Sequence, residues 1–209
     1  MIASPGRLVL ASASPRRAEL LRAAGFDFDF QVVDVDEAVL PDERPDLYVR
    51  RVAEAKARAA AGRSPRRAIL GADTTVVVEG TILGKPGDVD DAARMLRLLS
   101  GRAHDVMTGV CLVHLVPRRS PPTDGANGSG DVPCDIRLEV TTVEFAPLSR
   151  AEIDWYIASG EPMGKAGAYA IQGLAARFVT RIGGSYSNVV GLPVALVYGM
   201  CREAGLLLS

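Results

Sequence analysis

The 209-residue sequence has few histidines and cysteines, almost no net charge and no long apolar run. Its three cysteines, Cys111, Cys134 and Cys201, are widely spaced, so the sequence offers neither a metal-ligand motif nor a disulfide framework. A formal net charge of −1 provides no overall field toward nucleic acid or a membrane surface. Without a membrane-length apolar stretch or a signal-peptide pattern, we expect a cytoplasmic protein with no nucleic-acid or membrane partner.

Lysine is also scarce, with three residues against 21 arginines. A compact ammonium on a flexible stem is not interchangeable with a planar guanidinium. Each of the three lysines, Lys56, Lys85 and Lys165, is therefore a candidate for a specific role.

The composition is that of an ordinary globular chain, with 48% hydrophobic and 23% charged residues. The length suits one large domain or two lobes around a cleft. Apolar periodicity and turn residues predict helices that start near residues 15, 45, 88, 149 and 193, and strands at 8–10, 26–35, 68–70, 75–78, 104–116, 136–145, 168–172 and 177–182. A hairpin turn is predicted at 79–80, after which Ile82 and Leu83 lead into a loop. This mixture of helices, hairpins and crossovers favours an α/β fold with a mixed sheet. Residues 117–133 are poor in apolar side chains and predict a flexible surface loop.

The first predicted helix carries an electrostatic conflict. Ser14 followed by Pro15 is typical of a helix start. Arg16 and Arg17 then occupy the first turn, where the helix dipole disfavours cations. A phosphate held between the two guanidinium groups, the hydroxyls of Ser12 and Ser14, and the free helix amides would remove the conflict. The alternative is a pair of solvated arginines.

Acidic residues follow two of the predicted strands. Asp73 comes just after an apolar strand, and Gly71 permits close backbone approach. Ligand sites favour the carboxyl ends of strands in α/β sheets, so Asp73 is the leading candidate for orienting a water or holding a divalent cation. Asp36 and Glu37 end another strand, and an acidic group there could share a magnesium ion with Asp73. The alternatives are a turn-forming aspartate and a solvated acidic turn.

Several isolated polar residues are weaker candidates. Lys85 lies in a Gly-Lys-Pro loop that a phosphate could approach, although the P-loop pattern is absent. Lys56 lies at the edge of a helical apolar face, where lysine commonly extends its ammonium to solvent. Gln172 could read the edge of a base or be a surface turn residue. His104 and His114 have no partner at metal-ligand spacing and are interpreted as structural.

Seven stretches, in this order, resemble the Maf family over nearly the whole chain. They are Leu-Ala-Ser-Ala-Ser-Pro-Arg-Arg-Ala-Glu-Leu-Leu (10–21), Gly-Ala-Asp-Thr-Thr-Val (71–76), Gly-Lys-Pro (84–86), Met-Leu-Arg-Leu-Leu-Ser-Gly (95–101), Ser-Gly-Glu-Pro (159–162), Lys-Ala-Gly-Ala-Tyr-Ala-Ile-Gln-Gly (165–173) and Gly-Ser-Tyr-Ser-Asn-Val-Val-Gly-Leu-Pro (184–193). Each stretch alone is weak, but the ordered set is specific.

The resemblance implies a nucleoside triphosphate pyrophosphatase with a house-cleaning role. Such an enzyme cleaves between the α- and β-phosphates with a divalent metal cofactor, Mg²⁺ or Mn²⁺. The implied fold is like that of inosine-triphosphate pyrophosphatases, with an elongated mixed β-sheet, flanking helices and two lobes around a cleft. It also implies that residues 1–209 form a single Maf-like domain and that the protein is a homodimer.

The resemblance also assigns roles to residues. The family's catalytic proton acceptor matches Asp73, and its selectivity positions match Arg16, Thr74 and Gln172. The threonine after the aspartate is similar to the branch acting on dTTP and UTP rather than on 7-methyl-GTP. Positions that handle phosphate and metal match Ser12, Glu37, Lys56 and Lys85, with Glu37 and Asp73 implied as the metal ligands.

The sequence departs from the family pattern at Gly164 and in the 117–133 insertion, which is longer than most and adds no recognisable chemistry, and two other interpretations remain open. Gly164 stands where the family usually has aspartate, which puts a loop contact in doubt. An aspartyl-phosphate phosphatase would need a second aspartate where Thr75 stands. A nucleotide-binding regulator of septum formation with little turnover is the alternative outside enzymology.

Overall fold

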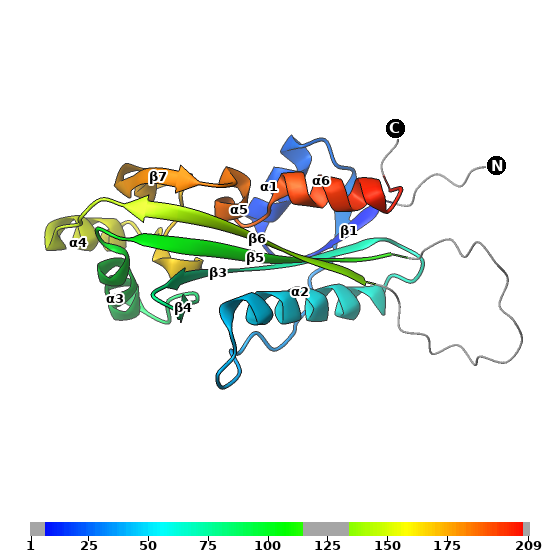
Figure 1. Cartoon of the computed structure of the whole chain (residues 1–209), viewed down its shortest axis with the longest axis horizontal. Coiled ribbons are helices and arrows are strands. Elements are labelled where there is room, and N and C mark those ends of the chain that lie inside the picture. The colour runs from blue at the N-terminus through cyan, green and yellow to red at the C-terminus, as the bar shows by residue number, and fades with distance from the viewer. Residues whose placement is uncertain (1–6, 115–133, 207–209) are drawn as a thin grey trace, which may run out of the picture.

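The structure is a computed structural model that describes residues 7–114 and 134–206, so the predicted 117–133 loop lies outside the described residues. It contains a seven-stranded sheet with helices on both faces (Figure 1). The strands are β1 (Leu8–Ala11), β2 (Phe28–Phe30), β3 (Ile69–Val78), β4 (Thr81–Leu83), β5 (Ala103–Val113), β6 (Cys134–Phe145) and β7 (Val179–Gly183). The α-helices are α1 (Pro15–Ala23), α2 (Pro45–Ala61), α3 (Val89–Leu99), α4 (Arg150–Ala158), α5 (Tyr186–Val190) and α6 (Val194–Glu203), with 3₁₀ turns η1 (Ala166–Ala168) and η2 (Leu174–Phe178).

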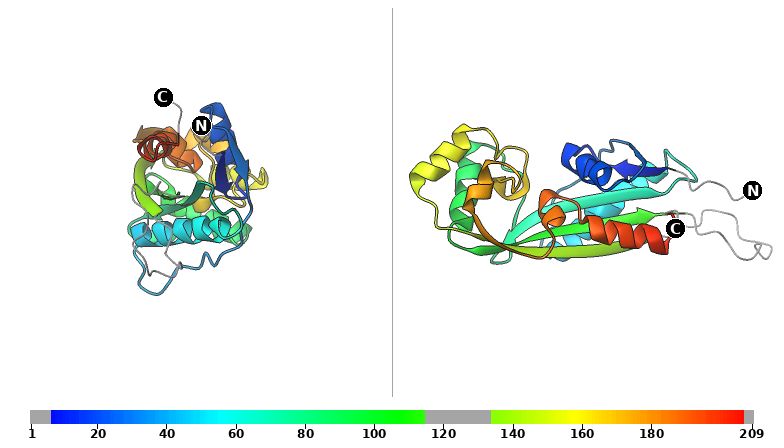
Figure 2. Two further views of the ribbon diagram at one scale, coloured as in Figure 1. Left: turned by 90° about the vertical axis from the view of Figure 1, so that its right-hand side faces the viewer. Right: turned by 90° about the horizontal axis from the view of Figure 1, so that it is seen from above.

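The sheet is mixed, which confirms the predicted α/β fold class. Its strand order is β2-β1-β3-β5-β6-β7, with β4 also paired to β3. The pairings of β1 with β2 and with β3 are parallel, and the others are antiparallel. Antiparallel strands β5 and β6 pair over their whole length and run through most of the elongated molecule (Figures 1 and 2).

Helices cover the sheet differently along its length. Helix α2 covers one face, and α1 and α6 lie on the opposite side (Figure 1). Helices α3 and α4 gather with η1 and η2 at the far end of the β5–β6 pair (Figure 2). The core is divided in the same way, with one cluster at the far end and others on the two faces near β1. No helix within residues 7–114 and 134–206 has the length and apolar character needed to cross a membrane.

Two glycines allow α2 to press directly onto the sheet. A Cβ on Gly71 would lie 2.3 Å from the carbonyl oxygen of Ala53, and one on Gly109 would lie 2.3 Å from that of Val49. Only glycine permits so close an approach of two backbones. This packing brings the buried face of α2, which includes Lys56, against β3.

The helix ends follow the local sequence signals. Asp88 caps α3 by accepting a hydrogen bond from the Asp91 amide, and Ser149 with Glu152 forms the predicted capping box of α4. Pro15 opens α1 as predicted, but the Ser14 hydroxyl makes no capping bond.

Three strand predictions and one loop prediction need correction. Residues 69–78 form one continuous strand rather than two. Strand β2 ends at residue 30 because its partner β1 supplies only three paired positions. Residues 168–172 are not a strand, since the left-handed backbone of Gly167 and Ala168 turns the chain there. The predicted loop at 183–188 contains the start of α5.

Candidate active site

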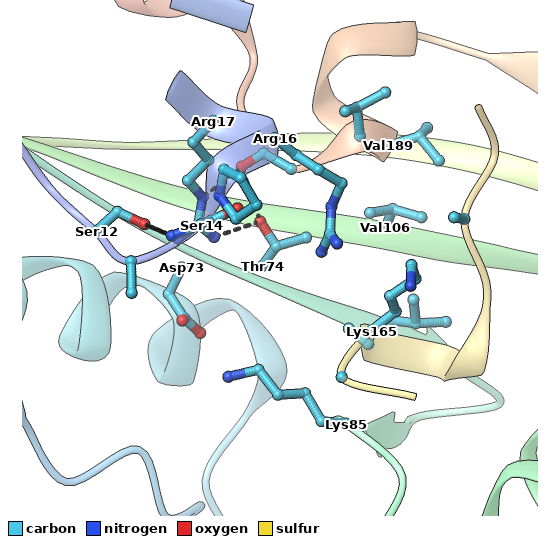
Figure 3. A pocket seen from close by; sticks show the side chains of 18 of the residues that line it. Ser12, Ser14, Arg16, Arg17, Asp73, Thr74, Lys85, Val106, Lys165 and Val189 are labelled. Carbon is cyan, nitrogen blue, oxygen red and sulfur yellow. Dashed lines mark hydrogen bonds between the residues drawn. The ribbon is translucent and has the colours of Figure 1, made fainter. Parts of the chain in front are cut away.

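A cavity of about 310 Å³ lies between the β1–α1 end of the molecule and the segment 164–172 from the far end (Figure 3). All the site residues that the family resemblance assigned line it. These residues are Ser12, Arg16, Glu37, Lys56, Asp73, Thr74, Lys85 and Gln172.

The cavity forms where one edge of β3 has no neighbouring strand. Pairing with β1 ends at Gly71, and pairing with β4 begins at Val76. Successive strand side chains point to opposite faces, so Asp73 faces α2 while Thr74 faces α1 and α5. Asp73 therefore lies within β3 rather than beyond its carboxyl end as predicted, and the strand that ends beside it is β1.

Lys56 joins the two carboxylates predicted to act together. Its Nζ lies 2.7 Å from Asp73 Oδ1 and 2.6 Å from Glu37 Oε1. Lys56 and Asp73 are both buried, whereas Glu37 is partly open to solvent. Burial raises the pKa of Glu37, but the hydrogen bonds and charges of Lys56 and, to a smaller extent, Lys85 together outweigh burial and hold this pKa below its usual value. Lys85 approaches the same carboxylate from the cavity side, with Nζ 3.4 Å from Oε2.

Tyr48 on α2 holds the backbone of Glu37 in place. The Tyr48 hydroxyl donates a 3.1 Å hydrogen bond to the Glu37 carbonyl oxygen. Burial, followed by the charges of Asp73 and Glu37, raises the pKa of Tyr48 to about 12, so the phenol remains a donor at neutral pH. Asp36 instead accepts the Ala38 amide at 2.8 Å and does not line the cavity.

The two arginines of α1 have separate environments, which corrects the predicted anion site between them. Arg17 is buried and donates to the carbonyl oxygens of Gly191 and Ala72 and to the hydroxyls of Ser12 and Thr74, at 2.8, 2.9, 3.3 and 3.0 Å. Burial lowers the pKa of Arg17. Arg16 extends into the cavity and has no hydrogen-bond or ion-pair partner among the described residues (Figure 3).

Lys165 faces Arg16 from the other side of the cavity (Figure 3). Its Nζ donates to the carbonyl oxygen of Glu161 at 2.5 Å, and no carboxylate pairs with it in the described part of the chain. Burial and then the charge of Arg16 lower the pKa of Lys165. Two unneutralised cations on opposite walls indicate an anion between them.

The lining also separates by polarity. It contains five cationic side chains and two carboxylates, a formal excess of three positive charges. Val106 and Val189 form an apolar wall on one side, away from Asp73 (Figure 3). A charged region beside an apolar wall fits a ligand with a polyanionic end and a flat apolar end.

The acidic residues fit a divalent cation only if the ligand completes its coordination. No group of three or more His, Cys, Asp and Glu side chains able to hold a metal occurs within the described ranges. Asp73 Oδ2 has no hydrogen-bond partner there, and Mg²⁺ commonly takes one or two carboxylates together with substrate phosphates. Asp73 and Glu37 thus fit such a cation.

Sequence reasoning gave Arg17 only a share in the phosphate site, which the structure corrects, and it assigned no particular role to Lys165. The helical spacing contains a signal for Arg17, because it lies one turn before the fully buried Leu21 and on the same face. Lys165 was singled out by lysine scarcity, but its position opposite Arg16 depends on how the two ends of the molecule meet.

The fold and this cavity define an α/β protein built to hold a polyanion. The family model described as Maf-like protein matches residues 7–204, and the chain belongs to the Maf family. A dTTP/UTP pyrophosphatase of Anaeromyxobacter dehalogenans is 51% identical over 95% of this chain and 94% of its own length. The dTTP/UTP pyrophosphatase of Koribacter versatilis is 48% identical over 96% of this chain and 95% of its own length. That of Geobacter sulfurreducens is 49% identical over 97% of this chain and 98% of its own length.

One solved structure, that of the Staphylococcus aureus Ham1 protein, covers 95% of this chain and 99% of its own, with a TM-score of 0.49 and 12% identity. A likeness this distant adds nothing to the functional argument.

Proposed function

We propose that the protein hydrolyses dTTP and UTP to the nucleoside monophosphate and pyrophosphate. The observation that carries the proposal is the arrangement of Lys56, Asp73 and Glu37, with Arg16 and Lys165, which no carboxylate of the described residues neutralises, lining the same cavity. The names of relatives about half identical over nearly the whole chain support the choice of nucleotide.

In this proposal, Asp73 orients the attacking water and accepts its proton. Lys56 holds Oδ1, which leaves the two lone pairs of Oδ2 for the water and for a divalent cation. The water oxygen forms a bond to the α-phosphorus as the bond from that phosphorus to the bridging oxygen breaks. Pyrophosphate leaves with the electron pair. Positioning and electrostatic stabilisation supply most of the catalysis in reactions of this type.

The cations stabilise the charge that builds on the leaving group. Arg16, Lys85 and Lys165 line the cavity and can contact the phosphates without first breaking a buried carboxylate pair. The first-turn amides of α1 have no side-chain cap and add donors of the same kind. A divalent cation held by Asp73 and Glu37, Mg²⁺ or Mn²⁺, would neutralise phosphate charge and help to orient the triphosphate.

A nucleotide panel tests the proposal directly. Purified protein is incubated with dTTP, UTP, CTP, ATP, GTP and 7-methyl-GTP, with Mg²⁺, with Mn²⁺ or with a chelator. Release of pyrophosphate and monophosphate is measured together, because a phosphatase would release orthophosphate instead. We expect dTTP and UTP to be the best substrates and the chelator to stop turnover.

Two results would contradict the proposal in different ways. Binding of dTTP without turnover in any metal would favour the nucleotide-binding regulator. A purine triphosphate as the best substrate would keep the pyrophosphatase activity and remove the proposed selectivity. The homodimer and the cytoplasmic location stay predictions, the first tested by light scattering after gel filtration and the second by cell fractionation.

A further inference from the structure

The Thr74 hydroxyl is already fully engaged inside the protein. Its Oγ1 lies 3.0 Å from an Arg17 terminal nitrogen, 2.9 Å from Thr108 Oγ1 and 3.2 Å from the carbonyl oxygen of Gly191. A hydroxyl offers one proton and two lone pairs, so three partners use its whole capacity.

The direction of each hydrogen bond follows from the chemistry of the partners. The guanidinium of Arg17 can only donate to Thr74, and the Gly191 carbonyl can only accept from it. Thr74 therefore donates its single proton to the Gly191 carbonyl oxygen, and Thr108 donates to Thr74. This arrangement also gives the proton of Thr108, a fully buried residue, its only hydrogen-bond acceptor among the described residues. Thr74 has no donor or acceptor left for a base.

Gly191 connects this network to the apolar wall of the cavity. Its carbonyl oxygen accepts from both Arg17 Nε, at 2.8 Å, and Thr74. Val189 and Val190, here called the valine wall, line the cavity directly and immediately precede Gly191. The left-handed backbone of Gly191, with φ of +126°, allows the chain to turn its carbonyl toward Arg17.

A second set of hydrogen bonds holds the start of the valine wall from the opposite side. The buried Asn188 amide donates to the Val106 carbonyl oxygen and to Thr141 Oγ1, both at 3.0 Å. The wall is thus fixed at both ends, and Arg17 is the cation that fixes the end nearest Thr74. A buried guanidinium bonded to carbonyls and hydroxyls, and to no carboxylate, serves geometry rather than charge neutralisation.

We propose that Arg17 and Thr108 are positioning residues that set base selectivity by fixing the valine wall, and that Thr74 acts through this network instead of contacting the base. The inference rests on the proposed function, since a base must lie against that wall. A rigid wall discriminates by size, so the network separates pyrimidines from the larger purines.

Substitution of Thr108 distinguishes this network from direct contact, because Thr108 is fully buried and does not line the cavity. The quantity measured is the ratio of kcat/KM for dTTP to that for GTP. Thr74→Val and Thr108→Val should each lower the ratio roughly fivefold or more, the scale of one unmade buried hydrogen bond. Thr74→Ser and Thr108→Ser keep the hydroxyl and should restore the wild-type ratio.

A matched control uses a threonine outside the network. Thr142 on β6 donates to Asp105 at 2.8 Å, so Thr142→Val removes a comparable hydrogen bond and should leave the ratio unchanged. A wild-type ratio in Thr108→Val, with a lowered ratio in Thr74→Val, would overturn the proposal in favour of direct contact. Wild-type ratios in both would overturn it as well.

A measurement that does not depend on turnover tests the network directly, even if a variant folds poorly or the proposed function is wrong. Nitrogen-15 NMR reports the exchange of the Arg17 Nε proton with water, which the bond to Gly191 should slow in the wild type. Thr74→Val should speed this exchange, and Thr142→Val should not. Fast exchange in the wild type would overturn the network even if dTTP is hydrolysed. Slow exchange without hydrolysis of any nucleotide would reject only the proposed function.

Discussion

Asp73 and Thr74 are consecutive residues whose side chains lie on opposite faces of β3, and both line the same cavity. Both can do so because the edge of β3 is open between the pairings to β1 and β4. One face supplies the cluster of Lys56, Asp73 and Glu37, and the other supplies the network of Arg17 and Thr74. Two consecutive residues of β3 thus have different proposed roles, Asp73 in catalysis and Thr74 in base selectivity.

The first prediction concerns Asp73. Asp73→Asn should lower pyrophosphate release about 10²–10⁴-fold, the effect of removing a positioned general base. The isosteric amide should leave the fold intact, as judged by circular dichroism and thermal unfolding. Asp105→Asn, on β5 and away from the cavity, is the matched control and should keep its activity. Near-wild-type turnover by the Asp73 variant would remove this residue from the mechanism.

The second prediction separates the neighbouring arginines. Arg16→Ala and Lys85→Ala should each weaken triphosphate binding by about 1–3 kcal/mol, because each removes a charged hydrogen-bond partner of phosphate. Both should unfold near the wild-type temperature, since Arg16 has no partner among the described residues and the Lys85 contact is long and exposed. Arg17→Ala should instead lower the unfolding temperature, since it removes the four hydrogen bonds that the buried guanidinium donates. Unchanged calorimetric binding in the first two variants would contradict the phosphate site.

The third prediction tests the contact between α2 and the sheet. Gly71→Ala places a Cβ 2.3 Å from the Ala53 carbonyl oxygen, so α2 must move away from β3. Overpacking of this kind costs about 1–3 kcal/mol of folding free energy. Because α2 carries Lys56, turnover should fall as well. Denaturant unfolding and dTTP hydrolysis check both effects, with Gly62→Ala on open backbone at the end of α2 as the control.

Features with local causes could be predicted from the sequence. Asp88 caps α3, and Pro15 and Pro45 open helices, because a few adjacent residues determine these ends. Most residues of the candidate site could also be named, because they fall in short stretches similar to one family, whereas Glu37 and Lys56 lie outside those stretches. The division of β3 into two strands was wrong because glycine and aspartate usually interrupt strands. Here the strand continues because Gly71 packs against the backbone of α2 and Asp73 pairs with Lys56.

Features that depend on distant partners could not be predicted. The length of β2 depends on how much of β1 is available to pair with it. The separate roles of Arg16 and Arg17 depend on Gly191, which lies 174 residues after Arg17 and supplies its acceptor. No property of the motif around residue 16 reports that contact.

The fourth prediction concerns stability in acid. His104 is buried against Tyr169 and Phe145, and burial lowers its pKa from 6.5 to about 4. Between these values the unfolded chain binds a proton that the folded chain does not, so stability should fall as the pH falls from 6.5 toward 4. His104→Gln removes the titration and should lose less stability than the wild type over this interval. Parallel loss of unfolding temperature in both proteins would contradict the assignment.

The last prediction concerns the edge of the base. Gln172 is exposed, lines the cavity and has no hydrogen-bond partner in the part of the chain that the structure describes. Its carboxamide can donate and accept at once, which matches the O4 acceptor and N3 donor of thymine or uracil. Cytosine presents an amino donor in place of O4, and a mismatch that the bound base shields from water costs about 1–3 kcal/mol, or roughly 5- to 150-fold at room temperature. Rotation of the amide recovers part of this loss, so the preference over CTP should be smaller than that over purines.

Gln172→Ala should therefore lower the dTTP-to-CTP ratio of kcat/KM more than it lowers the dTTP rate itself. The same variant should retain most of its discrimination against GTP, because size selection lies with the valine wall and Arg17. Thr108→Val should show the opposite pattern, with the GTP ratio reduced and the CTP ratio largely kept. If Gln172→Ala lowered both ratios equally, the same residues would select for the hydrogen-bonding edge of the base and for its size. The proposed separation of these two roles between Gln172 and the valine wall would then be wrong.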